Sequence, residues 1–382
     1  MEGDEAVSGL RARLKAMGAA ADAPKREIRR GSLLTYAVRQ DLEPGLTELS
    51  GVGLRRIGWS GRSFDVRRCL FLDTETTGLS GGAGTVAFLV GVGFVEGSSF
   101  VIEQYLMRDY ADEPELIDRL ANRMDGFDCV CTFNGRTFDM PLLEARFTMC
   151  RMRHRWREME NLDLLPPSRR TWKLRLGSCR LSRLEELVLG MPRTDDLPGS
   201  EVPQRYFEYL KSGDLSLLDD IIRHNRQDIA TLATLLVKLC EIYDAPEQLE
   251  EKRDLFSVGK ALERQGELKP ARELYRISAI PAPAGTLTAL TGDRIAGMAN
   301  WRIYLLARRS GDVEGMCAVL EQMLARNQMP CAAHTELAKL YEHRCRDYRK
   351  ALNHAQAARK ICTIDEAEAL DRRVARLEQK LK

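Results

Sequence analysis

The chain has 382 residues, enough for two domains, and its net charge of +2 is too small to indicate a polyanionic partner. No run approaches the about 18 consecutive apolar residues of a membrane span, and the N-terminal segment lacks the apolar centre of a signal peptide, so we expect no membrane partner. The ten cysteines are scattered without a C-x-x-C pair, which favours reduced thiols and a cytoplasmic location over disulfides or structural zinc.

The N-terminal part is mixed in character, and we predict that residues 1–65 form an extension. Within it, KREIRRGSLL (25–34) indicates a short basic helix or arm, and GVGLRRIGWSG (51–61) indicates a small strand or loop. From residue 66 the pattern becomes regular. The apolar runs CLFLD, TVAFLVGVGF and FVIEQYL, separated by glycine-rich or polar breaks, predict three consecutive strands.

Helices and strands then alternate. The apolar spacing in EPELIDRLANRM and in MPLLEARFTM predicts two helices, FDCVCTF predicts a strand, and ENLDLL predicts a further short strand. In LSRLEELVLG, Ser182 and Glu185 form a capping-box signature for a helix that ends at Gly190. A longer helix is predicted from Asp214 to Ile242. This order predicts an α/β domain with a mixed β-sheet, residues 66–242.

Basic residues outnumber acidic ones between Arg146 and Arg183. Such a stretch can attract phosphates, and Trp156 and Trp172 within it could offer stacking surfaces for bases. The alternative is a solvated helix face with two packed tryptophans.

Only helices are predicted after residue 242. Three segments share one plan, in which a helix and a short polar turn precede a second helix with a small residue near its start: Ala271, Gly315 or Ala351. They resemble tetratricopeptide-type helical pairs and predict an all-α domain, residues 243–382. Such repeats stack into a curved surface that binds another macromolecule. The alternative is an all-α cap packed on the α/β domain.

Two carboxylates, Asp73 and Glu75, follow the first buried strand in CLFLDTETTGLS. Residues two apart share a face of a strand, so both side chains point the same way. Like charges held this close need a cation, a shared proton or water. The alternative is a strand that ends in a polar turn built from Thr76, Thr77 and Gly78.

Two further segments carry acidic residues. CTFNGRTFDMPLL places Asp139 at the start of a helix, where it could simply be a cap. IIRHNRQDIATLATLL places His224 and Asp228 four apart on one helix face, a spacing that is also typical of a surface pair. If the four carboxylates converge, two divalent ions about 3.5–4 Å apart would neutralise them and support in-line displacement at phosphorus.

The segments DTETTG, NGRTFD and HNRQD, in this order, resemble the three motifs of the DEDD superfamily of 3′–5′ exonucleases. LGSCRLSRLEELVLG and the helical repeats narrow the resemblance to the bacterial YprB-like branch. The resemblance implies a ribonuclease-H-like fold, two Mg²⁺ or Mn²⁺ ions, and hydrolysis of nucleic acid, with DNA favoured over RNA. It also implies DNA repair or maintenance beside a helicase or another protein, bound through the repeats.

The resemblance also assigns roles by position. The expected metal ligands are Asp73, Glu75, Asp139 and Asp228. His224 takes the place of the residue that orients or deprotonates the attacking water, although the histidine subgroup places it five residues before the last aspartate and not four. Asp163 is expected to be structural or to support the ligands. Expected nucleic-acid contacts are Thr74, Asn134, Phe138, Arg169 and Lys173.

Two other functions stay open from the sequence. The chain could be a nucleic-acid-binding scaffold with a weak or inactive nuclease site that acts through its helical repeats, but the intact set of four carboxylates argues against this. A ribonuclease-H-like endonuclease is disfavoured by the order of the motifs and by the helical spacing of His224 and Asp228.

Overall fold

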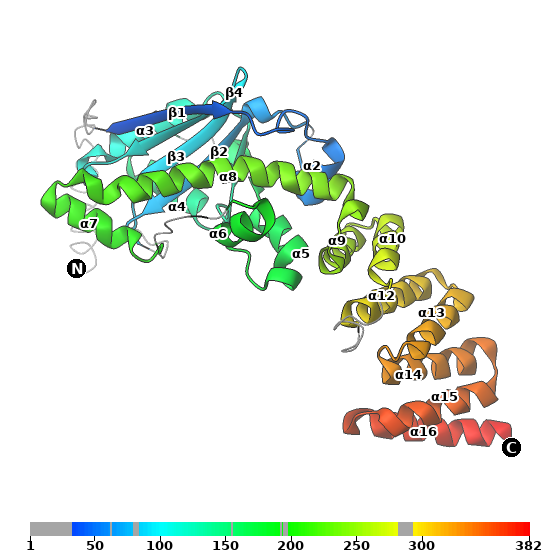
Figure 1. Cartoon of the computed structure of the whole chain (residues 1–382). Coiled ribbons are helices and arrows are strands. Elements are labelled where there is room, and N and C mark those ends of the chain that lie inside the picture. Colours follow the sequence, from blue (N-terminus) through cyan, green and yellow to red (C-terminus); the bar gives the residue numbers. More distant parts are fainter. Residues whose placement is uncertain are drawn as a thin grey trace, which may run out of the picture.

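The computed structural model describes residues 33–61, 63–78, 84–153, 156–191, 193, 198–281 and 293–382 (Figure 1). It has an α/β part followed by a row of helices that leads to the C-terminus. The basic helix or arm predicted at residues 25–34 lies almost wholly outside the described residues. Among the described helices, none combines the length and the apolar character needed to cross a membrane.

Six strands form one sheet in the order β1-β4-β3-β2-β5-β6. They are β1 (Leu34–Asp41), β2 (Cys69–Thr76), β3 (Ala87–Glu96), β4 (Ser99–Leu106), β5 (Cys129–Thr132) and β6 (Glu160–Asp163). Neighbours from β1 to β2 are antiparallel, whereas β5 is parallel to both β2 and β6. The predicted mixed sheet, its three consecutive strands and the short strand in ENLDLL are therefore confirmed.

The first strand corrects the N-terminal boundary that we predicted at residue 65. β1 pairs with β4 along its whole length, from Leu34 opposite Leu106 to Asp41 opposite Ser99. The sheet domain thus begins at residue 34 or earlier. β1 escaped prediction because it is an edge strand, in which only alternate residues are partly buried.

Helices cover both faces of the sheet, and α8 crosses it as one long helix (Figure 1). The helices of this part are α2 (Gly51–Ile57), α3 (Glu113–Met124), α4 (Asp139–Met149), α5 (Leu165–Leu176), α6 (Leu181–Leu184), α7 (Val202–Ser212) and α8 (Asp219–Asp244). Phe71 of β2 packs in a core with α2, α5 and α8, whereas Leu70 and Leu72 pack in a second core with α3 and α4. Alternation along β2 therefore separates two layers of helices.

Two local predictions were wrong. Residues 51–57 are helical because Ser50 Oγ accepts hydrogen bonds from the backbone N–H groups of Val52 and Gly53, both at 3.1 Å. The capping box of LSRLEELVLG is also absent, since α6 begins at Leu181 and the Glu185 side chain is turned into the core.

The helix predicted from Asp214 starts with a 3₁₀ turn that Asp214 caps, and α8 itself begins at Asp219.

The C-terminal helices form successive pairs, as predicted. They are α9 (Lys252–Arg264), α10 (Leu268–Ser278), α12 (Arg294–Ser310), α13 (Val313–Ala325), α14 (Pro330–Leu340), α15 (Tyr348–Ile361) and α16 (Ile364–Leu381). Ala271 and Ala351 are fully buried at the starts of second helices, where a small side chain lets two helices lie close together. The alternative of a cap on the α/β domain holds for the first pair only: α9 and α10 pack on the α/β part, and the later helices lead away from it (Figure 1).

Two ion pairs attach the first helical pair to the α/β part. Arg175 of α5 lies with Nε 2.8 Å from Oδ2 of Asp254 on α9, and Arg56 of α2 lies with Nη2 2.6 Å from Oε2 of Glu267. Asp254 is buried, and burial raises the pKa of its carboxyl to about 6 in spite of the Arg175 charge. The orientation of α9 on α5 therefore depends on a buried charge.

Replacing Arg175 by Gln should lower the free energy of unfolding by about 3–5 kcal/mol at pH 8, because Asp254 stays buried without its partner. Asp254 has a higher pKa in the fold than in the unfolded chain, so its contribution to stability is present at pH 4 and is lost as the pH rises through about 6. The destabilisation should therefore be smaller at pH 5, where Asp254 takes up a proton. Urea unfolding at both pH values measures the difference.

The control for this experiment is Arg68→Gln, which removes an exposed pair with Asp128. Its unfolding midpoint should stay close to that of the native chain, because exposed pairs contribute little. A loss in Arg175→Gln that is the same at pH 5 and pH 8 would contradict the role given to Asp254.

Candidate active site

Two carboxylates lie at the end of β2, under helix α8. Asp73 and Glu75 share the face of the strand that carries Phe71, as predicted. Asn225 of α8 donates from Nδ2 to Asp73 Oδ2 at 2.9 Å. His224, one residue earlier, lies with Nδ1 3.6 Å from Glu75 Oε1. The first and third motifs are therefore in direct contact.

Glycines in β3 allow α8 to lie this close to the sheet. Gly91 is paired with Asp73 in the register of β2 and β3, and a Cβ at Gly91 would lie 2.2 Å from Oδ1 of Asn225. A Cβ at Gly93 would lie 2.5 Å from a side chain of the same helix. Gln104 of β4 then fixes Asn225 by donating to its Oδ1 at 2.9 Å. A side chain at Gly91 would push the helix away from Asp73.

Asp139 approaches from the other side of β2, as the first residue of α4. The hydroxyl of Thr74, the residue between the two carboxylates of β2, donates to Asp139 Oδ1 at 2.5 Å. The Asp139 side chain is buried. Thr74, which we expected to contact nucleic acid, therefore has its hydroxyl directed to Asp139.

The loop before α4 is held by Asp163. Asn134 has φ 68°, a left-handed conformation that asparagine tolerates, and its backbone N–H donates to Asp163 Oδ1 at 2.8 Å. The backbone N–H of Leu165 donates to the same oxygen at 3.0 Å. Asp163 therefore joins the start of α5 to the loop that carries Asp139, which fits the supporting role expected for it.

Arg193 is a member of the site that the sequence did not predict. Its guanidinium donates to Glu185, to Asp228 and to His224, and only 7% of its side chain is exposed. Glu185 is fully buried and also accepts a hydrogen bond from Thr231 of α8. No local pattern marks Arg193, because its partners lie 8 to 35 residues away in the chain.

Three carboxyl groups of the site, those of Asp73, Asp139 and Asp228, are harder to ionise than free ones. Burial raises the pKa of Asp73 well above its ordinary value, and the negative charges of Asp228 and Asp139 raise it further. Burial also raises the pKa of Asp139 to about 6 and that of Asp228 to about 6, although the charges of His224 and Arg193 partly offset the shift at Asp228. The predicted carboxylates are thus close enough to repel one another.

The contact with Arg193 defines the protonation of His224. A guanidinium can only donate, so Nε2 of His224 accepts from Arg193 and the ring proton of the neutral imidazole lies on Nδ1. Nδ1 faces Glu75 and also lies 3.4 Å from Asp228 Oδ2. Burial lowers the pKa of His224, but its hydrogen bond to Glu75 and the charge of Asp228 outweigh burial, so the net pKa is raised.

The chemistry of the donor set fits hard divalent cations, since all four predicted ligands offer carboxylate oxygens. In the described residues, however, no three His, Cys, Asp or Glu side chains are grouped so that they could hold an ion as they stand. The oxygens are turned to protein donors: Thr74 at Asp139, Asn225 at Asp73, and Arg193 at Asp228. Metal binding would therefore require small side-chain rotations and the release of Arg193 from Asp228.

A cavity of about 260 Å³ opens beside the carboxylates. Five of the predicted site residues line it: Asp73, Thr74, Asn134, Phe138 and Asp139. Phe138 is 51% exposed, so its ring is accessible beside this cavity. An exposed ring beside buried carboxylates could stack on a base.

The predicted basic contacts and tryptophans lie elsewhere. Arg169 and Lys173 line a separate groove between α5 and α9. Trp156 and Trp172 are buried, 5% and 1% exposed, so they pack in the core and offer no stacking surface. The expectation that the tryptophans could stack on bases was wrong.

Comparison with known proteins agrees with this architecture. Residues 70–240 match the family model described as the RNase_H superfamily. Over 329 residues, the chain is 29% identical to the protein named "Uncharacterized protein YprB" of Bacillus subtilis (strain 168). The aligned region covers 84% of this chain and 77% of that protein. This similarity agrees with the resemblance to the YprB-like branch. Residues 70–240 therefore form a domain of the RNase_H superfamily, and an all-α region follows it.

Proposed function

We propose that this chain is a metal-dependent 3′–5′ exonuclease that hydrolyses phosphodiester bonds of nucleic acid. One observation carries the proposal. Buried carboxylates from β2, α4 and α8 lie close together at the end of β2, with His224 beside them. Such a cluster is destabilising by itself, which favours a catalytic over a structural role. The order of the three motifs supports removal of nucleotides from the 3′ end.

The ligands of the proposed two ions, Mg²⁺ or Mn²⁺, are Asp73, Glu75, Asp139 and Asp228. When bound, such ions activate a water and stabilise the leaving oxygen of an in-line displacement. The chain itself contributes position: Asn225 orients Asp73, Thr74 orients Asp139, and α8 carries Asp228 and His224 on one face. Phe138 would hold the terminal base beside the cavity.

His224 is the proposed general base. Its Nε2 lone pair, which here accepts from Arg193, would accept the proton of the attacking water once Arg193 withdraws. Nδ1–H facing Glu75 and Asp228 would hold the ring in this tautomer and stabilise the imidazolium that forms.

A second candidate function is a nucleic-acid-binding scaffold with a weak or inactive nuclease site. The observation that favours it is the guanidinium of Arg193, which pairs with Asp228 and His224. The two candidates differ in hydrolysis. Digestion of matched 5′-labelled DNA and RNA strands, with free or blocked 3′ ends and with Mn²⁺ or EDTA, separates them, and it also tests the preference for DNA.

A protein partner remains a proposal drawn from the resemblance. We propose that the helical repeats bind a helicase or another protein of DNA repair, because the helices beyond α10 lead away from the α/β part and leave their surface accessible (Figure 1). Co-purification of the full chain with and without α14 to α16 would test this.

Replacing Asp139 by Asn should abolish hydrolysis, because one ligand loses its charge. The same change should not lower stability in EDTA at pH 7, since a buried carboxyl with a pKa of about 6 is destabilising when it ionises. The increase in melting temperature caused by Mn²⁺ should be lost. The exposed Asp128→Asn serves as a control, and near-native turnover of Asp139→Asn with Mn²⁺ would exclude the proposed ligand set.

Replacing His224 by Gln should lower the turnover number by about 10²–10⁴, because a general base is lost. The part of the decline of activity in acid that comes from protonation of His224 should also disappear, so the decline should become smaller, while the Mn²⁺ concentration for half-maximal stabilisation should change little. Turnover measured across pH with native chain and variant provides the comparison. An unaltered pH profile in the variant would mean that another group receives the proton.

Replacing Arg193 by Gln should tighten Mn²⁺ binding by roughly tenfold or more, because a cation that competes for Asp228 is removed. In EDTA the variant should be less stable than the native chain, since Glu185 and Asp228 lose their buried partner. Calorimetric titration with Mn²⁺ and melting in EDTA measure the two effects. Weaker Mn²⁺ binding would instead show that Arg193 positions Asp228 for the metal.

A further inference from the structure

A basic groove lies between α5 and α9, where the α/β part meets the first helical pair. Three cations come from α5 and two from α9: Arg169, Arg170, Lys173, Lys260 and Arg264. The cavity volume is about 500 Å³, and none of the described residues that line it carries a carboxylate. Each domain therefore contributes one wall of the same positively charged groove.

The cations of the groove lack counter-ions. None of the five forms an ion pair with a carboxylate of the described residues. By contrast, Arg175 of α5 pairs with Asp254 of α9, and Arg302 of α12 pairs with Glu263 of α9. Arg170 donates from Nη2 to the carbonyl of Ile57 at 2.8 Å, but its buried Nε has no partner among the described atoms. The groove thus concentrates charge that the protein does not neutralise.

The spacing of these residues increases the repulsion. Arg169 and Lys173 are four apart on α5, and Lys260 and Arg264 are four apart on α9, so each pair lies on one helix face. Like charges at this spacing destabilise a helix. Two such pairs that face one groove are unfavourable unless an anion is bound there.

The arrangement fits a chain of phosphates better than a single one. Each pair spans about 6 Å along its helix axis, so the charges are spread along both walls. Leu174, which is 45% exposed, and Met298 add apolar surface on which bases could lie. Both charge and shape match the backbone of a single nucleic-acid strand.

The helix that forms one wall of the groove, α5, starts beside the loop that precedes Asp139. α5 begins at Leu165, whose N–H is bonded to Asp163, the residue that holds the loop before Asp139. Arg169 and Lys173 therefore lie about 6 and 12 Å further along the helix axis. A strand with its end at the carboxylates could continue along α5.

We infer that the α5–α9 groove binds the phosphodiester backbone of the substrate strand away from the scissile bond. The inference rests on the proposed nuclease function and extends it: the first helical pair is a part of the substrate site and not only a spacer. Strands long enough to reach α9 are bound more tightly than short ones.

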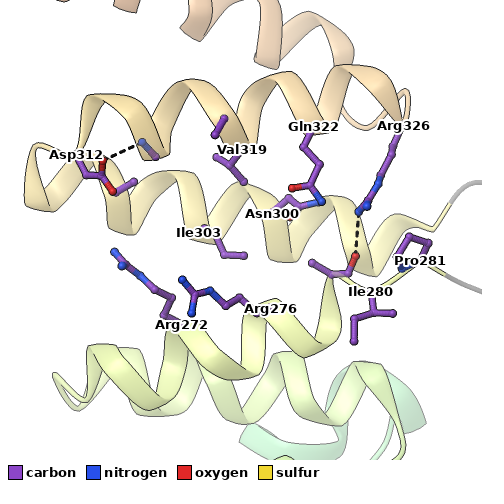
Figure 2. Close-up of a pocket in the computed structure, with 14 residues that line it drawn as sticks. Arg272, Arg276, Ile280, Pro281, Asn300, Ile303, Asp312, Val319, Gln322 and Arg326 are labelled. Atoms are coloured by element: carbon purple, nitrogen blue, oxygen red, sulfur yellow. Dashed lines mark hydrogen bonds between the residues drawn. The ribbon is translucent and has the colours of Figure 1, made fainter.

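A second groove provides a matched comparison. Figure 2 shows Arg272 and Arg276 of α10 reaching toward a groove between α10, α12 and α13. There Asp312 lines the groove, Arg276 pairs with Glu273 at 3.3 Å, and Arg326 donates to a backbone carbonyl. This second groove has the same four-residue basic spacing but contains a carboxylate.

The test compares Lys260→Gln/Arg264→Gln with Arg272→Gln/Arg276→Gln. Binding of a labelled single-stranded DNA of about 20 nucleotides is measured by fluorescence anisotropy in EDTA across KCl concentrations. The groove variant should bind more weakly, and its salt slope should fall by about 1.4, because each lost phosphate contact contributes about 0.7. The control variant should bind as the native chain does. Arg169→Gln/Lys173→Gln, on the other wall, should repeat the loss without altering α9.

Two outcomes would overturn the inference: unchanged affinity and salt slope in both groove variants, or an equal loss in the Arg272→Gln/Arg276→Gln control. Melting temperatures show whether each variant is folded, and the two walls give independent readings. Hydrolysis by the native chain with Mn²⁺ judges the proposed function separately. Binding in the groove without hydrolysis would show that the groove binds a nucleic-acid strand but would reject the nuclease, and with it the role of that strand as substrate.

Discussion

Repulsion among buried carboxylates is the constraint on which the rest of this structure depends. Asp73, Asp139 and Asp228 come from three separate elements. Burial raises the pKa of each, and the negative charges of Asp228 and Asp139 raise the pKa of Asp73 further. The fold tolerates them through three donors, the hydroxyl of Thr74, the amide of Asn225 and the guanidinium of Arg193. Each donor satisfies one carboxylate, and Arg193 also places a positive charge beside Asp228.

The need for these three donors explains why particular residues are required around the site. Asn225 can reach Asp73 only because β3 has a glycine opposite that aspartate. Thr74 reaches Asp139 only because the loop from Asn134 is held by Asp163. The carboxylates of the candidate site are thus supported by contacts between elements that are far apart in sequence.

The sequence predicted the parts of this site that are local. The buried run before Asp73, the turn before Asp139 and the helical spacing of His224 and Asp228 each have a short-range signal, and the positions of β2 to β6 along the chain followed from apolar runs. Arg193, Asn225 and Gly91 carry no such signal, because their roles depend on which elements become neighbours. The edge strand β1 and the capped helix α2 were missed for a related reason, since few of their residues are buried.

The long helix α8 joins the two ends of the molecule's α/β part. It has 26 residues, so it is about 39 Å long. Near its start it lies against Gly91, and near its end a Cβ at Gly53 would lie 2.7 Å from the carbonyl of Cys240. At Gly91 the close contact is with the side chain of Asn225, and at Gly53 it is with the backbone of Cys240. A tilt of α8 beside the carboxylates would therefore also change the contact of α8 with α2, next to the joint with the helical pairs. The geometry of the candidate site and the angle of that joint are coupled through this one helix.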